Sequence, residues 1–143
     1  FQRQSEPSHR EANDRVTIYL TFLKRCIMPI SNMAKLNFTG AERDALDELA
    51  IVLKQKWPSI TLKIFGSKVH NTTDTESDID LLIVLPCSVT TDIRRWIVHM
   101  IFEVNLKYET NISGLIISDE EWQGFPLSLL PIHDSIESEG IAL

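Results

Sequence analysis

Apolar positions at helical spacing predict two long helices in this chain. One covers residues 39–57 and stops at Pro58, and the other covers residues 90–109. Thr39 and Glu42 form the sequence of a capping box at the start of the first helix. The apolar stripe of the second helix consists of Ile93, Trp96, Ile97, Met100, Ile101, Val104 and Tyr108.

Short runs of β-branched and other apolar residues predict three strands between and after these helices. They cover residues 60–65 (ITLKIF), 78–85 (DIDLLIVL) and 112–118 (ISGLIIS). A second capping box follows the third strand, and one more helix is expected between Pro126 and Gly140. The predicted fold is therefore α+β, with a small mixed β-sheet covered by helices.

The N-terminal part of the chain has a weaker pattern. Residues 1–10 are polar, and residues 11–28 carry apolar side chains at helical spacing before Pro29. Ile18 and Phe22 blur that spacing, so this predicted helix has apolar residues on two sides. A helix of this kind can pack against the domain or dock onto a partner.

Composition excludes several classes of function. The 143 residues have the length of one domain, and 14 basic against 20 acidic residues give a net charge of −6. We expect no direct binding to duplex nucleic acid, because such binders present a basic face. No apolar run reaches the ~18 residues of a membrane span. Cys26 and Cys87 lack the spacing of a metal site, which favours a reducing compartment, so we predict a cytoplasmic protein.

Asp78 and Asp80 are the first candidates for chemistry. In a strand, alternate residues share a face, so the two carboxylates lie on one side at the strand's entrance, with their Cα atoms about 7 Å apart. Two anions held on one face repel each other, and a divalent cation between them relieves that repulsion. The alternative is that the two aspartates only make the start of a strand soluble.

The segment Gly66-Ser67-Lys68 is the second candidate. Gly66 ends a predicted strand, where the backbone must turn sharply or approach another group closely. Ser67 offers a hydroxyl and a backbone N–H, and Lys68 offers a cation. If residues 67–72 form a helical turn, its N-terminus can bind an anion such as a phosphate.

These two segments together resemble the signature of the polymerase-β-type nucleotidyltransferase superfamily. The signature is Gly66-Ser67, ten intervening residues, then Asp78-Ile79-Asp80 and the apolar run LLIVL. The chain is most similar to the small stand-alone minimal nucleotidyltransferase proteins. The resemblance continues through ISGLIISDEEW and EGIAL. It implies a nucleotidyltransferase domain over residues 39–143, with residues 1–38 as an N-terminal helical extension.

The resemblance also implies roles for the site residues. Gly66, Ser67 and Lys68 would bind the phosphates of a nucleoside triphosphate, and Asp78 and Asp80 would be the catalytic, metal-binding residues for Mg²⁺. A second metal ion is also compatible with such a site. The implied reaction transfers a nucleoside monophosphate from the triphosphate to an acceptor hydroxyl.

The chain departs from the family at the third carboxylate. Ser113 stands where active members carry an acidic residue, and a missing general base costs on the order of 10²–10⁴ in rate. Glu103 and Glu109 are candidate substitutes, but we expect both on the exposed side of the long helix. Whether the protein is an active enzyme is therefore left open by the sequence.

Two other functions remain open at this point. A catalytically degenerate member would act as a binding partner, since minimal nucleotidyltransferases are often paired, like an antitoxin with its toxin, with helical HEPN-type proteins. Such a partner can itself be the acceptor of the nucleotide. A homo-oligomer is also compatible with the sequence. The least specific alternative is a mixed α/β domain in which the motif has no function.

Overall fold

The computed structural model describes residues 36–70 and 78–143. The predicted helix over residues 11–28 lies outside the described residues, and so does most of the predicted N-terminal extension. Within the described residues no helix is long and apolar enough to cross a membrane.

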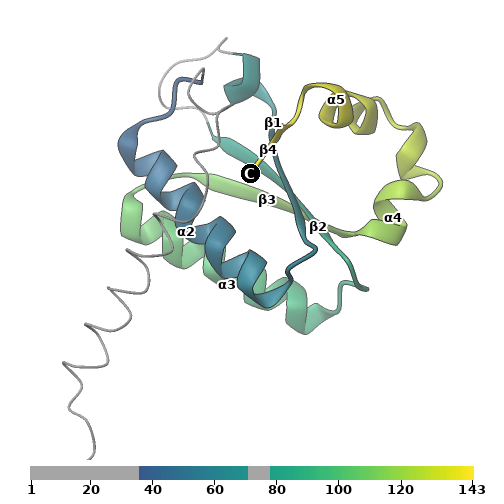
Figure 1. Ribbon diagram of the computed structural model, residues 1–143, viewed down its shortest axis with the longest axis horizontal. Coiled ribbons are helices and arrows are strands. Elements are labelled where there is room, and N and C mark those ends of the chain that lie inside the picture. Colours follow the sequence, from purple (N-terminus) through teal and green to yellow (C-terminus); the bar gives the residue numbers. More distant parts are fainter. Residues whose placement is uncertain (1–35, 71–77) are drawn as a thin grey trace, which may run out of the picture. The chain divides into compact units, whose positions relative to one another are not determined.

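Four strands form one mixed sheet in the order β3-β2-β1-β4 (Figure 1). Strand β2 (Ile79–Leu85) pairs with β1 (Thr61–Phe65) in antiparallel orientation and with β3 (Ile112–Ser118) in parallel orientation. The short strand β4 (Ile141–Ala142) pairs with the other edge of β1. The three predicted strands are therefore confirmed, and β2 lies in the interior of the sheet.

Helices cover both faces of this sheet (Figure 1). The long helices α2 (Gly40–Lys56) and α3 (Thr91–Tyr108) pack against each other. The shorter helices α4 (Asp119–Gln123) and α5 (Pro131–Glu139) follow β3. The predicted α+β fold, a mixed sheet covered by helices, is confirmed.

The core explains why β2 reads as a continuous apolar run. On one face Leu82 and Val84 pack against Trp122 of α4 and Ile136 of α5. Residues of the opposite face, such as Leu81 and Leu85, are also fully buried. A strand covered on both sides needs apolar residues at every position, and only its entrance is free to carry carboxylates.

The capping boxes set where two helices begin. Thr39 accepts a hydrogen bond from the Glu42 backbone N–H, and the Glu42 carboxylate accepts one from the Thr39 N–H. Ser118 and Glu121 make the same exchange at the start of α4. Both caps were predicted from the sequence and are confirmed, because capping depends on residues only three positions apart.

Candidate functional site

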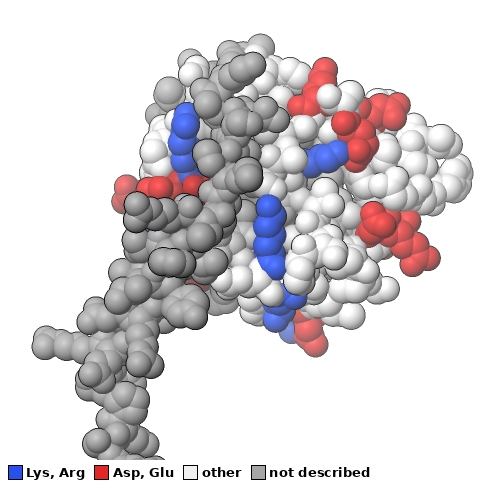
Figure 2. Space-filling model, in the orientation of Figure 1, with Lys and Arg blue, Asp and Glu red and all other residues white. Residues whose placement is uncertain are grey.

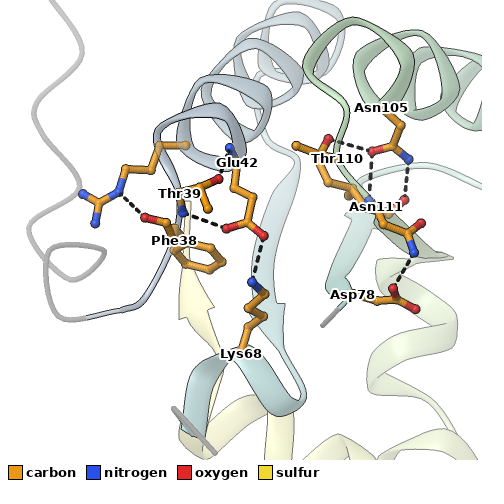
Figure 3. Close-up of polar contacts among 10 residues, drawn as sticks. Phe38, Thr39, Glu42, Lys68, Asp78, Asn105, Thr110 and Asn111 are labelled. Carbon is orange, nitrogen blue, oxygen red and sulfur yellow. Dashed lines mark hydrogen bonds and ion pairs between the residues drawn. The ribbon is translucent and has the colours of Figure 1, made fainter. Parts of the chain in front are cut away.

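The register of β2 and β3 gives each aspartate a hydrogen-bond donor. Ser113 pairs with Asp80 across the two parallel strands, and its hydroxyl donates to Asp80 Oδ1 at 2.8 Å. Asn111 precedes β3 and donates through Nδ2 to Asp78 Oδ1 (Figure 3). The Asn111 carbonyl in turn accepts the Ile79 N–H at 2.9 Å. The two carboxylates are thus held by two neutral donors, one in β3 and one just before it.

The Gly66-Ser67 turn lies directly against the second aspartate. Phe65, at the end of β1, pairs with Asp80, so Gly66 follows at the level of that carboxylate. Gly66 has a φ of +79°, and a Cβ built on it would collide with Asp80 Oδ2. Both a left-handed backbone and a close approach therefore require glycine here. Two segments separated by ten residues in the chain meet at one point of the sheet.

Ser67 begins a 3₁₀ helix, η2 (Ser67–His70), immediately after this turn. The Val69 N–H closes the turn on the Gly66 carbonyl at 3.1 Å. The predicted helical turn over residues 67–72 is therefore present as far as His70, and its last two residues lie outside the described residues. Ser67 is half-buried and directly follows the glycine that lies against Asp80.

Lys68 points away from the exposed surface and is only 6% exposed. Its ammonium lies 2.7 Å from Glu42 Oε1, while Oε2 of the same carboxylate accepts the Thr39 N–H (Figure 3). The ammonium also lies 5.8 Å from the centre of the Phe38 ring. This ion pair lies in the interior of the domain, since both side chains are buried. The predicted part of Lys68 in nucleotide binding stays a prediction.

Glu42 is a supporting residue that the sequence did not reveal. Its capping-box pattern explains one carboxylate oxygen, but the other oxygen binds Lys68, which is 26 positions away. Asn105 is a second such residue (Figure 3). Its amide accepts the Ile112 N–H and donates to the Ile112 carbonyl, both at 2.9 Å, and so fastens the start of β3 to α3. Contacts of this kind carry no local sequence signal.

The two suggested substitutes for a third carboxylate lie on the surface. Glu103 is exposed on α3, and its Oε1 lies 4.0 Å from His99 Nε2. Glu109 is exposed and forms the left-handed C-cap of the same helix, with a φ of 54°. The expectation that both lie on the exposed side is confirmed. Among the described residues no cluster of three or more His, Cys, Asp and Glu side chains could hold a metal ion.

The donor set nevertheless fits Mg²⁺. This ion is usually held by one or two carboxylates, with water and substrate phosphates completing its octahedral shell. Asp80 Oδ1 is taken by Ser113, whereas Oδ2 lies against the Gly66-Ser67 turn. None of the ion pairs between described residues involves Asp78 or Asp80. Two carboxylates that no ion pair within residues 36–70 and 78–143 occupies provide a place for a divalent ion together with phosphates.

Comparison with known proteins agrees with this geometry. The model of the family described as nucleotidyltransferase domain matches residues 46–139, more than half of the chain. The matched range contains the Gly-Ser turn and both aspartates. Neither the curated proteins nor the solved structures contain a significant match. The resemblance seen in the sequence is confirmed, and the chain belongs to the nucleotidyltransferase domain family.

Proposed function

We propose that this domain is a Mg²⁺-dependent nucleotidyltransferase. The acceptor hydroxyl oxygen attacks the α-phosphorus of a nucleoside triphosphate, and the bond from that phosphorus to the bridging oxygen breaks. Pyrophosphate leaves, and the acceptor proton passes to solvent water. The observation that most supports this proposal is the contact of Gly66 with Asp80, which puts a phosphate-binding type of turn beside a metal-binding type of carboxylate pair.

Each site residue has a distinct role in this proposal. Asp78 and Asp80 would hold Mg²⁺, which when bound neutralises the triphosphate charge and that of the leaving pyrophosphate. The Ser67 hydroxyl binds a phosphate oxygen, and Gly66 lets the triphosphate approach the backbone. Lys68 acts mainly through Glu42, since this pair fixes η2 and the turn before it.

The lack of an acidic side chain at Ser113 of β3 lowers the expected rate of nucleotide transfer. Ser113 donates its hydroxyl hydrogen to Asp80 and has no carboxylate with which to receive the acceptor proton. A positioned general base contributes on the order of 10²–10⁴ to the rate. We therefore expect nucleotide binding to be easier to detect than turnover with an arbitrary acceptor.

Calorimetry with nucleoside triphosphates tests the binding part of this proposal. We expect saturable binding only when Mg²⁺ is present, and loss of that binding in the Asp78→Asn, Asp80→Asn double variant. The control is Asp119→Asn with Glu120→Gln, which removes the same two charges from exposed positions on α4. Unchanged affinity in the site variant, or no binding of any triphosphate to the wild type, would contradict the proposal.

A second candidate function is that of a degenerate, antitoxin-like binding partner of a HEPN-type helical protein. It is favoured by Ser113 and by three exposed apolar side chains at four-residue spacing on α3, which are Val98, Phe102 and Leu106. The same surface would also suit a homo-oligomer. Co-purification with a helical protein encoded by a neighbouring gene, lost in Phe102→Asp, would support this candidate. An isolated monomer at high concentration, with no such complex, would count against it.

The face drawn in Figure 2 bears on nucleic-acid partners. Among the described residues drawn there, Lys and Arg side chains are scattered rather than gathered into one basic surface. Our proposal takes a nucleotide as the substrate and does not include binding to a duplex.

A further inference from the structure

We propose that Asn111 and Ser113 are positioning residues that hold the Asp78 and Asp80 carboxylates in the orientation needed to bind a divalent cation. This inference rests on the proposed function and adds to it two residues that orient the metal-binding carboxylates. Asn111 and Ser113 lie two positions apart on the β3 side, as the aspartates do on the β2 side. Each donor therefore serves one acceptor.

The contact at Asp80 shows what the donor achieves. Ser113 binds Oδ1 at 2.8 Å, which fixes the rotation of the carboxylate about its last bond. The other oxygen, Oδ2, then faces the backbone of Gly66. Without this hydrogen bond the carboxylate would turn freely, and a cation would have to order it on binding. The Ser113 hydroxyl thus orients Asp80 Oδ2 toward the Gly66 turn, where the phosphates would lie.

The contact at Asp78 is made by a residue whose backbone is itself held firmly. The Asn111 carbonyl accepts the Ile79 N–H, and the next residue, Ile112, is fastened through both backbone groups to Asn105 of α3. The backbone of Asn111 is therefore held in place, and its side chain reaches Asp78 from a fixed position. Both hydrogen bonds also offset the repulsion between two neighbouring anions while no cation is bound.

Removing either donor should weaken metal binding more than it weakens the fold. Partners that orient metal-binding carboxylates typically contribute about 10–100-fold to metal affinity. Asn111 and Ser113 are both exposed, so their removal leaves no buried group without a partner in the core. A purely structural role predicts the opposite, a lower melting temperature with unchanged metal affinity.

The test is titration with Mn²⁺, followed by the electron paramagnetic resonance signal of the free ion, for wild type, Ser113→Ala, Ser113→Thr and Asn111→Ala. We expect about 10-fold weaker Mn²⁺ binding or more in both alanine variants, and recovery in Ser113→Thr because the hydroxyl remains. Ser135→Ala is the matched control, since Ser135 also donates to a carboxylate, that of Glu139 at the end of α5, which is neither Asp78 nor Asp80. Thermal unfolding of each variant shows that the fold is intact.

The outcomes separate this inference from the proposed function. Equal Mn²⁺ affinity in wild type and both alanine variants would overturn the inference, as would a loss in Ser113→Thr equal to that in Ser113→Ala. A wild type that binds no Mn²⁺, alone or with a triphosphate, would also overturn it. If the variants weaken Mn²⁺ binding but no triphosphate binds to the wild type, the inference stands and the proposed function fails.

Discussion

At the residue scale, Gly66 shows how one position can answer two demands at once. Its φ of +79° lies in the region that L-amino acids avoid, and its missing side chain leaves room for Asp80. A sequence can suggest glycine at a turn, and the predicted alternatives were a sharp turn or a close approach. The structure shows both, because β1 and β2 are antiparallel and their pairing brings the turn to the aspartate.

Gly66→Ala should therefore damage both the fold and the site. The left-handed backbone alone costs about 1–2 kcal/mol for a residue with a Cβ, and the collision with Asp80 Oδ2 adds to that cost. We expect a lower free energy of unfolding in urea and weaker binding of Mg²⁺ with triphosphate. Gly40→Ala is the control, because a Cβ at Gly40 meets no atom within 4 Å. Equal stability and equal binding in the two variants would show that Gly66 has no special role.

At the scale of elements, the site depends on ties between segments that are distant in the chain. The Lys68–Glu42 pair joins η2 to the first turn of α2, and Asn105 joins α3 to β3. The Tyr108 hydroxyl and the Lys107 ammonium both bind Glu48, which links α3 to α2. These ties keep the elements that carry the Gly-Ser turn and the two positioning residues in place.

Removing only one partner of the buried Lys68–Glu42 pair should strongly lower the free energy of unfolding. An uncompensated buried charge typically costs about 3–5 kcal/mol, whereas removal of both charges costs much less. We expect Lys68→Met to lower the free energy of unfolding by this amount, and the Glu42→Gln, Lys68→Met double variant to recover part of it. Urea unfolding of the double-mutant cycle measures the coupling. Additive effects of the two substitutions would refute a direct interaction.

At the scale of the whole molecule, local sequence patterns predict the helices and longer strands. The contacts within the site depend on strand pairing and on residues that are far apart in the chain. Capping boxes and apolar periodicity extend over a few residues, so the sequence predicts α2, α3 and α4 with their starts. Strand β4 was not predicted, because two residues carry no periodicity and the strand exists only where the edge of β1 receives it. The role of Asn111 was equally hidden, since its partner is 33 positions away.

Glu137 connects three elements and gives the molecule a predictable response to acid. Hydrogen bonds from Lys63 of β1 and from the Trp122 indole of α4 lower the pKa of Glu137 below its ordinary 4.5, although partial burial opposes them. A carboxylate with a lowered pKa in the folded state stabilises the fold above the unfolded pKa. That contribution is lost as the pH falls through the lower, folded value.

We therefore expect wild type to lose more stability than Glu137→Gln when the pH falls from about 5 to 3. Free energies of unfolding measured across this range test the expectation, with Glu120→Gln, at an exposed position of α4, as the control. Parallel pH profiles for wild type and Glu137→Gln would show that this carboxylate does not couple the three elements to pH.

The most direct test of the central claim is a crystal structure with Mn²⁺ and a non-hydrolysable nucleoside triphosphate analogue. The anomalous signal of Mn²⁺ locates the metal independently of the surrounding density. We predict a peak at the carboxylates of Asp78 and Asp80, with the triphosphate against Gly66 and Ser67. A bound analogue whose metal lies elsewhere, or an ordered Asp pair without Mn²⁺ at saturating concentrations, would contradict the account.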